Sequence, residues 1–382
     1  MAAQTPFDRL NPFLERIGDP GTPFVLEAPD GRVRRVGRGE PRFRATLRSD
    51  RAVKALASLD EGNFAEAYLR GDIDLDGDIQ SALALRTSLG DRHPLVAAWR
   101  FLQPLLFGQI YTNKAAIRAH YDLDPRLFLS FLDPVLPAYS QGVYAADDEP
   151  LETALRRKFD YAVRACDLGP GRKVLEIGPG WGAFAGHALA HGVDFVGLTI
   201  SEVSKTFIEE TLEPYRDRVT ILLEDVLAYR SEERFDAIVI MGVIEHLPDY
   251  ARVLRKFDAL LKPGGFVFLD GSAARKKYEL STFMVRHIYA GNHSFLVLDD
   301  FLNKLARSPF ELVELCNDRH SYELTFRQWA KNLERNAGAV VREFGEFEYR
   351  KFRLYLWGAT QEFASGNLDC YRMILRKPPS AA

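Results

Sequence analysis

The sequence is poor in cysteine and contains no long apolar run, and both absences narrow the classes of protein to which it can belong. The three cysteines, Cys166, Cys316 and Cys370, are too few and too far apart for a disulfide framework or a cysteine-based metal site. No apolar run approaches the roughly 18 residues of a membrane-spanning helix, and residues 1–21 lack the apolar core of a signal peptide. We therefore expect a cytoplasmic protein that meets a membrane only peripherally, at its inner face.

The sequence also lacks an excess of charge of either sign. Its 50 basic and 53 acidic residues leave a net charge of −3 at pH 7, so no global positive field gathers nucleic acid, and no nucleic-acid partner is expected. The chain of 382 residues is 47% hydrophobic and 27% charged, as is usual for a globular protein with a large core. Its length favours two domains.

Composition divides the chain into four segments. Residues 1–22 are interpreted as a flexible arm. Residues 23–90 are expected to form a small α+β domain for lipid binding or dimerisation, in which short alternating segments predict an antiparallel meander. Residues 91–116 are expected to be a helical linker, and its apolar part, residues 95–111, is a core, interdomain or interfacial helix. Residues 117–382 are expected to form the main domain.

Arginine is concentrated in the small domain. Seven arginines lie between Arg32 and Arg48, against a single acid, Glu40. They are interpreted either as a solvated face of the meander or as a patch for anionic lipid headgroups, where each basic residue near the surface contributes about 1 kcal/mol. The sequence leaves both interpretations open.

The main domain contains a glycine-rich turn between an apolar strand and a helix. Residues 174–182 are Val-Leu-Glu-Ile-Gly-Pro-Gly-Trp-Gly, and a helix of small residues, 183–190, follows. The glycines let a ligand approach the backbone, and the helix N-terminus offers free N–H groups beside it. A glycine-rich turn alone is a weak signal, because many are only tight turns. The Gly-Trp-Gly ending differs from the dinucleotide fingerprint and is similar to the methionine-binding turn of an S-adenosylmethionine (AdoMet) methyltransferase.

Strands and helices alternate after this turn, which predicts an α/β domain with a doubly wound parallel sheet and a ligand at the carboxyl ends of its strands. Residues of about 272–335 are expected to be a mostly helical insertion that forms a lid over the site. A helix over 344–363 and a strand over 369–375 complete the domain. The other strands are expected at residues 174–177, 195–200, 219–223, 235–241 and 266–269.

A polar side chain lies at or just after the end of each of the first four strands. Glu176 lies at the first, Thr199 at the second and Asp225 at the third, and Glu245 and His246 follow the fourth. An adenosyl ligand needs such a set, with a carboxylate or hydroxyl for the ribose and an acceptor for the adenine amine. Any one of these residues is as well explained as a helix cap, but four in register are hard to obtain by capping alone.

A set of short motifs runs from about residue 117 to residue 375. They are Ala119-His120-Tyr121-Asp122-Leu123, Leu132-Asp133-Pro134, Tyr139-Ser140, Val174–Gly182, Gly197-Leu198-Thr199-Ile200-Ser201, Ile244-Glu245-His246, and Tyr322 with Trp329. In combination they resemble the cyclopropane-fatty-acyl-phospholipid synthases and their mycolic-acid relatives. Residues 61–85 are similar to the small N-terminal domain of that family, so the resemblance covers most of the chain.

The resemblance implies that residues 117–382 are an AdoMet-dependent methyltransferase domain of class I, with a helical lid, that adds a methylene or methyl group to a double bond in the acyl chain of a membrane phospholipid. By matching position, AdoMet is contacted by Tyr139, Ser140, Gly178, Thr199, Ile200 and His246. With the glycine turn and the strand ends added, the candidate cofactor-binding residues are Tyr139, Ser140, Glu176, Gly178, Gly180, Gly182, Thr199, Ile200, Ser204, Asp225, Val226 and His246.

In the family that the chain resembles, a bound bicarbonate acts as the base that allows ring closure, and Glu245 and Tyr322 fall on two of its ligands. The chain departs from the pattern beside them, because Gln141 replaces a cysteine and Asp270 replaces a bicarbonate-binding histidine. A carboxylate in place of a histidine removes a donor and adds a like charge, which weakens anion binding. The candidate catalytic residues are Glu245, Tyr322, Asp270 and Gln141.

Two hypotheses follow for the base. Either Asp270 or Glu245 removes the proton directly, or Asp270 only caps a strand end while bicarbonate still binds. If the base has moved, the cation formed on methylation can lose a different proton. The product is then a methyl- or methylene-branched chain instead of a cyclopropane.

Three functions remain open from the sequence. The first is lipid modification, with a membrane phospholipid that carries an unsaturated acyl chain as substrate and, by resemblance, a homodimer as the assembly. The others are a methyltransferase for a small-molecule amine or carbon centre and a noncatalytic AdoMet- or lipid-binding homologue. No metal site is predicted, because His187, His191 and the other histidines are interpreted as lacking ligand spacing.

Overall fold

The computed structural model of the chain divides into two compact units, each described here by itself. The first unit contains the described residues of Met1–Ala97, Ser281–Ile288 and Leu333–Gln361, and the second contains those of the remaining chain. The expected linker at 91–116 and the motif at 119–123 lie outside the described residues. The structure describes residues 5–90, 124–277, 280–289 and 293–379.

The first unit is built on a four-stranded sheet in the order β2-β1-β3-β4. Its strands are β1 (Phe24–Glu27), β2 (Val33–Val36), β3 (Phe43–Leu47) and β4 (Ile73–Gly77). The antiparallel meander that we expected is wrong, because β3 pairs with β1 in parallel and not with β2. The rings of Phe24 and Phe43 stack 4.8 Å apart across this pair, and β4, which we had not predicted as a strand, pairs with the other edge of β3.

The N-terminal segment is helical where we expected a flexible arm. It forms α1 (Pro6–Arg9) and α2 (Asn11–Ile17), and the side chains of Leu10, Phe13 and Ile17 are buried. Thr5 and Asp8 form a reciprocal capping box at the start of α1. The expectation for residues 1–22 was wrong because the apolar spacing of three and four along residues 10–17 gives these helices a face that packs in the unit.

Further helices complete the first unit. They are α3 (Asp50–Ala57), α4 (Glu61–Leu69) and α5 (Ile79–Ala84). Each begins after an N-cap residue whose side chain accepts a backbone N–H of the first turn; these N-caps are Ser49, Asp60 and Asp78. The short 3₁₀ helix η1 (Leu85–Ser88) follows α5. Within the segment 333–361, α15 (Ala337–Phe344) and most of α16 (Glu346–Ser365) also cluster with this unit.

Two arginines of α16 explain why that segment departs from our expectation that it belongs to the main domain. Arg350 donates to the carbonyl oxygens of Tyr68 and Ile73, at 3.2 and 3.0 Å, and Arg353 donates to that of Leu75 at 3.1 Å. These donors satisfy backbone acceptors at the end of α4 and along β4, contacts that no local sequence pattern announces.

The arginine-rich part of the first unit is largely paired. Arg35 pairs with Glu40, Arg42 with Asp78, Arg44 with Glu27, and Arg48 with Asp74. Arg32 also pairs with Asp30, so five of the seven arginines have carboxylate partners on the surface. This pairing favours the interpretation of a solvated face; such exposed pairs contribute little to stability.

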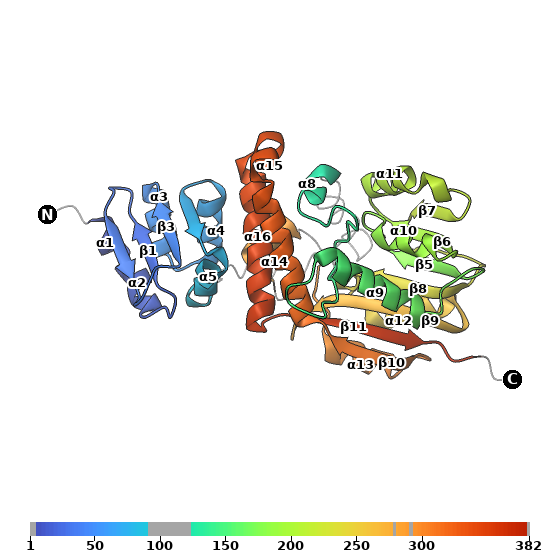
Figure 1. Ribbon diagram of the computed structural model, residues 1–382. Helices are drawn as coiled ribbons and strands as arrows, with labels where there is room; N and C mark the ends of the chain where they lie inside the picture. Colours follow the sequence, from blue (N-terminus) through green and yellow to red (C-terminus); the bar gives the residue numbers. More distant parts are fainter. Residues whose placement is uncertain (1–4, 91–123, 278–279, 290–292, 380–382) are drawn as a thin grey trace. The chain divides into compact units, whose positions relative to one another are not determined.

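The second unit is built on a seven-stranded sheet in the order β10-β11-β9-β8-β5-β6-β7 (Figure 1). The neighbours from β9 through β8, β5 and β6 to β7 are parallel, while β11 is antiparallel to both β9 and β10. The predicted doubly wound α/β fold is confirmed as a mixed sheet. Its strands are β5 (Lys173–Ile177), β6 (Asp194–Thr199), β7 (Val219–Leu223), β8 (Phe235–Met241), β9 (Leu261–Ala273), β10 (Glu311–Asn317) and β11 (Asp369–Arg376).

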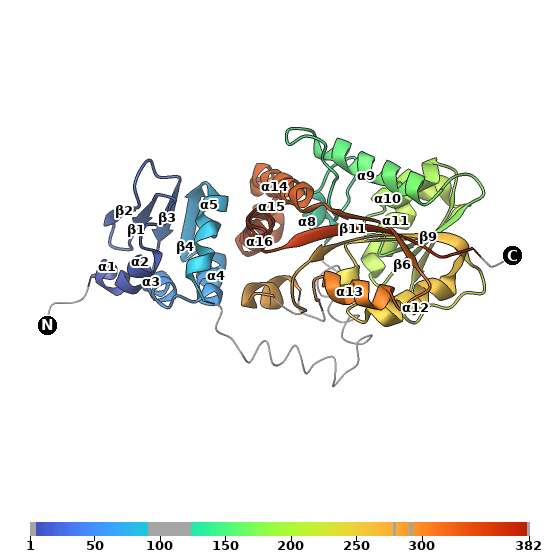
Figure 2. The same ribbon diagram turned by 90° about the horizontal axis from the view of Figure 1, so that it is seen from below.

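Helices cover both faces of this sheet. Figure 2 shows α9 and α10 on one face and α12 and α13 on the other. The main core lies between the sheet and α12 and α13, where Tyr250, Phe257 and Phe301 pack on Ile238 and Leu269. The helices of the unit are α8 (Pro125–Leu129), α9 (Leu151–Ala165), α10 (Ala183–Ala190), α11 (Glu202–Thr211), α12 (Tyr250–Leu260), α13 (Leu298–Leu305) and α14 (Arg319–Arg335), with short turns η2 (Glu213–Tyr215) and η3 (Ile244–His246).

The insertion at 272–335 is only partly the helical lid that we expected. Residues 311–317 form β10, an edge strand of the main sheet, and residues 284–288 form the π-helical turn η4 (Met284–Ile288), which clusters with the first unit. The rest of the segment is largely helical, in α13 and α14, as predicted. The strand β10 was not predicted, because β11 offers it a free edge that only the folded sheet presents. Closure over the site stays a prediction.

No helix among the described residues is long and apolar enough to cross a membrane.

Candidate active site

The glycine-rich turn lies between β5 and α10. Its three glycines have positive φ angles, 70° at Gly178, 56° at Gly180 and 78° at Gly182, which glycine adopts without strain. A Cβ on Gly178 would lie 2.5 Å from Cγ2 of Val243, whereas one on Gly180 would meet no atom within 4 Å. At Gly178 the turn packs against Val243, whereas the space beside Gly180 is open. This open space lies near the first N–H groups of α10, an arrangement that suits a bound ligand.

The residues after β6 connect to this turn. Thr199 accepts the N–H of Ser201 at 3.2 Å, and Ser204, in the first turn of α11, donates its hydroxyl to the carbonyl oxygen of Gly180 at 2.5 Å. The hydroxyl of Ser204 therefore braces the glycine turn. Ile200 follows Thr199 at the carboxyl end of β6, as predicted.

The end of β7 holds the third predicted anchor. Asp225 accepts the N–H of Leu227 at 2.7 Å, so one of its oxygens closes a local turn, and Val226 beside it is buried. Asp225 therefore has a local structural role of the kind that we considered as the alternative for each polar residue at a strand end. Contact of Asp225 and Val226 with a cofactor stays a prediction.

Glu176 lies near the end of strand β5, just before the glycine-rich turn, and its carboxylate is buried. It is 3% exposed, and its Oε2 has no hydrogen-bond partner among the described residues. Burial raises the pKa of Glu176 to about 8; the nearby Lys158 lowers it and Asp270 raises it further. A buried acceptor without a partner is costly, so this oxygen suits a ligand that brings a positively charged donor.

Lys158, in the middle of α9, is the cation of the site. Its Nζ donates to the hydroxyl of Ser140 at 2.7 Å and to Oδ2 of Asp270 at 3.3 Å, and the side chains of both ions are fully buried. Asp270 also accepts the N–H of Gly242 at 3.0 Å on its other oxygen. Burial raises the pKa of Asp270, and Lys158 opposes that rise. Both oxygens of Asp270 are thus engaged.

Glu245 lies in η3, just after β8, and is 3% exposed. Its Oε1 accepts the N–H of Ser272 at 2.7 Å, while its Oε2 has no partner in the part of the chain that the structure describes. Burial raises the pKa of Glu245 to about 7. A Cβ on Gly271 would lie 3.3 Å from Oε2 and 2.5 Å from Cγ2 of Ile244, so only glycine at 271 leaves room for this carboxylate.

His246 is buried beside it and remains neutral near pH 7. Burial lowers the pKa of His246 to about 4. Its ring packs edge-on against His293, 4.9 Å away, and Tyr289, 6.0 Å away. A neutral imidazole can accept or donate a hydrogen bond without adding a positive charge to the site.

Aromatic rings pack around Tyr139. Tyr139 contacts Phe128 at 5.5 Å and Trp329 at 5.4 Å between ring centroids, and Tyr322 contacts Phe326 at 4.7 Å. We call the set the aromatic cluster. Its members are Phe128, Phe131, Tyr139, Trp181, Tyr322, Phe326, Trp329 and Phe363.

Gln141 belongs to the same segment as Tyr139 of the aromatic cluster and Ser140, which accepts a hydrogen bond from Lys158. It is 1% exposed, and its Nε2 lacks a hydrogen-bond partner among the described residues. Its neighbour Ser140 contacts Lys158, and a Cβ on Gly242 would lie 3.6 Å from the carbonyl oxygen of Tyr139. The segment therefore lies against the carboxyl end of β8.

The structure brings Glu176, Glu245 and Asp270 into one buried site, as their mutual electrostatic effects show. We had not predicted Lys158, although a signal was present. Leu151, Leu155 and Ala162 form an apolar stripe along α9, and Lys158 occupies a position in that stripe. A lysine within a buried stripe needs a partner, and it marks a site of this kind.

Comparison with known proteins gives one family for most of the chain. The family model described as mycolic acid cyclopropane synthetase matches residues 109–373, and a second model, described as a domain of unknown function, matches residues 14–89. The sphingolipid C9-methyltransferase of Candida albicans is 25% identical over 336 residues, which are 82% of this chain, and the chain spans 65% of the length of that protein.

Two further relatives cover most of their own length. The cyclopropane-fatty-acyl-phospholipid synthase of Escherichia coli is 28% identical over 331 residues, 84% of each protein. A solved structure of a mycolic acid cyclopropane synthase, complexed with SAH and CTAB, matches with a TM-score of 0.64 and 25% identity, over 69% of this chain and 98% of that one.

Gly178→Ala tests the glycine turn as the AdoMet site. The added Cβ would contact Val243 at 2.5 Å in a left-handed conformation, so the turn must move. We expect AdoMet affinity to fall by about 5- to 150-fold, which corresponds to about 1–3 kcal/mol of backbone strain. Isothermal titration calorimetry measures the affinity. The matched control is Gly169→Ala, where φ is not positive and the Cβ meets nothing within 4 Å; equal affinity in the two variants would contradict the assignment.

If Glu176 contacts AdoMet, as predicted, we expect binding to release a proton. With a pKa of about 8, Glu176 is mostly protonated at pH 7 in the free protein. An incoming ammonium group favours the charged carboxylate and lowers this pKa, so the proton leaves on binding, up to about one per chain. Titration calorimetry in two buffers of different ionisation enthalpy counts the protons. Glu176→Gln should lose most of the release, and a wild-type binding enthalpy that is independent of buffer would show the prediction to be wrong.

Proposed function

Because this chain belongs to the mycolic acid cyclopropane synthetase family, we propose that it transfers a methyl or methylene group from AdoMet to a carbon–carbon double bond in the acyl chain of an unsaturated membrane lipid. Family membership and the fold make the chain an AdoMet-dependent methyltransferase. The lipid substrate is the proposed part. It rests on relatives that are lipid-modifying enzymes by name and on the chemistry of the site.

The observation that carries the proposal is the buried Oε2 of Glu245, close to Asp270 at the carboxyl end of the sheet and in the same buried site as the segment of Tyr139 and Ser140. A methyltransferase for an amine needs only to orient a lone pair that is already nucleophilic. Methylation of an alkene leaves a carbocation, which needs negative charge nearby and an acceptor for its proton. A buried carboxylate with one free oxygen supplies both.

The residues present fit AdoMet. The open side of Gly180 lets the ligand approach the backbone, and the free Oε2 of Glu176 suits its ammonium group. Thr199, Ile200, Asp225, Val226 and His246 are proposed to hold the nucleoside at the strand ends. AdoMet, when bound, supplies a methyl group on a positively charged sulfur, and its positive charges favour the ionised forms of the buried carboxylates, whose pKa values burial raises.

The aromatic cluster is proposed to receive the acyl chain. An alkene is a weak nucleophile, so the protein must hold it in place and keep water away from the cation. Tyr322 and Trp329 are 6% and 0% exposed, and their rings offer an apolar wall with electron-rich faces. Such faces stabilise a nearby cation without reacting with it.

Glu245 is proposed as the base in preference to Asp270. Both oxygens of Asp270 already accept hydrogen bonds, from Lys158 and Gly242, whereas Oε2 of Glu245 has no such partner among the described residues. Asp270 therefore positions Lys158 and, through it, Ser140. Its negative charge also keeps the pKa of Glu245 high, which makes Glu245 a stronger base once it is ionised.

Bicarbonate fits these residues poorly. Glu245, once it is ionised, and Asp270 repel a further anion, and Lys158 already donates to Asp270 and Ser140. The amide of Gln141 and the hydroxyl of Tyr322 are neutral donors. We propose that the carboxylate of Glu245 takes the place of bicarbonate, and that contact with the membrane is peripheral; a homodimer stays a prediction.

Lipid analysis after expression tests the function. In a host rich in unsaturated phospholipids, we expect acyl chains that gain one methylene unit, measured by mass spectrometry. Loss of reactivity towards ozone identifies a ring, and retained reactivity identifies a branched alkene. Glu245→Gln should abolish the product, with a rate loss of roughly 10²–10⁴-fold, while the exposed Glu213→Gln should match the wild type. Unmodified lipids from a folded, AdoMet-binding wild-type protein would overturn the proposal.

The pH profile separates the two candidate bases. Because Glu245 must be ionised to accept a proton and its pKa is about 7, kcat should rise with pH through about 7 and reach a plateau above it. His246, with a pKa of about 4, stays neutral over this range. Asp270→Asn removes a negative charge that raises the pKa of Glu245, so it should retain activity and shift the profile to lower pH. Complete loss of activity in Asp270→Asn, with Glu245→Gln still active, would make Asp270 the base.

A further inference from the structure

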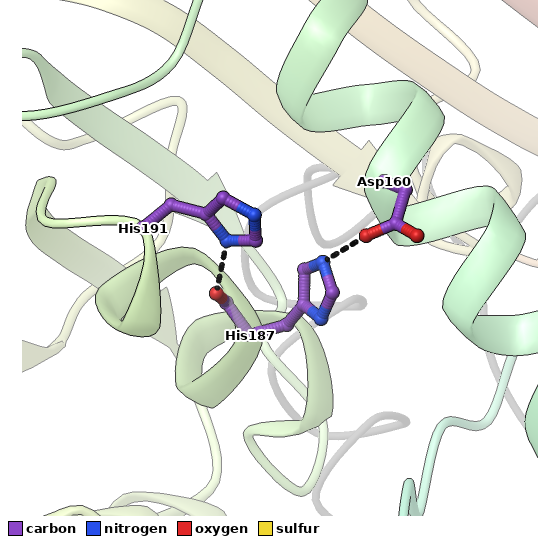
Figure 3. Close-up of side chains that lie close together, drawn as sticks. All are labelled: Asp160, His187 and His191. Carbon is purple, nitrogen blue, oxygen red and sulfur yellow. Dashed lines mark hydrogen bonds and ion pairs between the residues drawn. The ribbon is translucent and has the colours of Figure 1, made fainter.

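Two histidines and an aspartate meet on the surface of the second unit, outside the site described above. They are His187 and His191, four residues apart at the end of α10, and Asp160 in the middle of α9. Figure 3 shows the three side chains pointing toward one another across the two helices. We predicted no metal site from the sequence, but four residues bring two side chains onto one face of a helix, and α9 supplies the third.

The three potential ligand atoms lie within 4.8 Å of one another. Nε2 of His187 is 2.9 Å from Oδ1 of Asp160, yet it has no partner with hydrogen-bond geometry among the described residues. In a tetrahedral zinc site with bonds of about 2.1 Å, ligand atoms lie about 3.4 Å apart. A movement of up to about 1.4 Å, which the exposed His191 can make, is enough to bring the three atoms onto one ion.

The hydrogen bond of one ring nitrogen of His191 shows which of its nitrogens can bind a metal. Nδ1 of His191 lies 2.9 Å from the carbonyl oxygen of His187. A carbonyl only accepts, so Nδ1 carries the hydrogen and the lone pair of His191 is on Nε2. A histidine that donates to a backbone carbonyl through its other nitrogen is the usual arrangement of a metal ligand.

We infer that Asp160, His187 and His191 form a binding site for one divalent transition-metal ion of the zinc class. Two imidazoles and one carboxylate select ions such as Zn²⁺, Co²⁺ or Ni²⁺ over Mg²⁺ and Ca²⁺, which prefer oxygen ligands. His191 is exposed, so an ion can enter from solvent, and water completes its coordination.

The site would link α9 to α10 at a distance from the reaction. His191 is nine residues after Gly182, roughly 13 Å along the helix from the glycine turn. The ion would therefore act as a clamp between the helix that carries Lys158 and the helix that begins at the cofactor turn. It is not required for the transfer reaction proposed above.

Calorimetry with zinc chloride tests the inference on the full chain, prepared without a polyhistidine tag and stripped with a chelator. We expect one saturable site per chain, and an increase in Tm on addition of the ion. Co²⁺ in place of Zn²⁺ should give visible absorption bands that report nitrogen and oxygen ligands. Magnesium chloride should give no such signal.

Variants decide whether these residues are the ligands. His191→Ala changes an exposed side chain and should fold normally, and it should weaken Zn²⁺ binding by at least about tenfold, since loss of an outer-shell partner alone costs 10- to 100-fold. Asp160→Asn should weaken binding in the same direction. The control is His320→Ala, an exposed histidine whose two nitrogens contact separate carboxylates, Asp147 and Glu323. Equal Zn²⁺ affinity in His191→Ala and the wild type, or no saturable binding in the wild type, would overturn the inference.

Discussion

The second unit depends on the burial of three carboxylates around a single lysine at the carboxyl end of its sheet. Glu176, Glu245 and Asp270 are each 3% exposed or less, and Lys158 is fully buried. One lysine cannot neutralise three acids, and burial raises the pKa of Glu176 to about 8 and that of Glu245 to about 7. One oxygen of each has no hydrogen-bond partner among the residues that the structure describes. A protein tolerates this only where a ligand supplies the missing charge, as at many functional sites.

The fold makes this burial possible through glycines and backbone donors. Gly271 leaves space for the carboxylate of Glu245, whose other oxygen is held by the N–H of Ser272. Asp270 is held by the N–H of Gly242 as well as by Lys158. Glu245 and Asp270 are therefore fixed by β9, the residues after β8 and the turn η3. Among the described residues, one oxygen of Glu176 and one of Glu245 have no hydrogen-bond partner.

The same helix serves the site and the surface. α9 places Lys158 inward and, two residues later, Asp160 outward toward α10. Because α10 begins at Gly182 of the cofactor turn, the position of α9 against α10 sets the position of Lys158 relative to that turn. An ion held by Asp160, His187 and His191 would fix this relation from outside the reacting centre.

The sequence alone determined the order and type of most elements of the sheet, because β8 is a continuous apolar run and the glycine turn has one structural interpretation. It also determined the family, since short motifs such as Ile244-Glu245-His246 recur at their expected places. Only the tertiary structure decided which acids keep an oxygen without a partner among the described residues, that Lys158 lies between Asp270 and Ser140, and that β10 pairs with the edge of β11. These outcomes depend on hydrogen bonds and packing between residues far apart in the chain, such as Lys158 and Asp270, and no local pattern encodes such pairings.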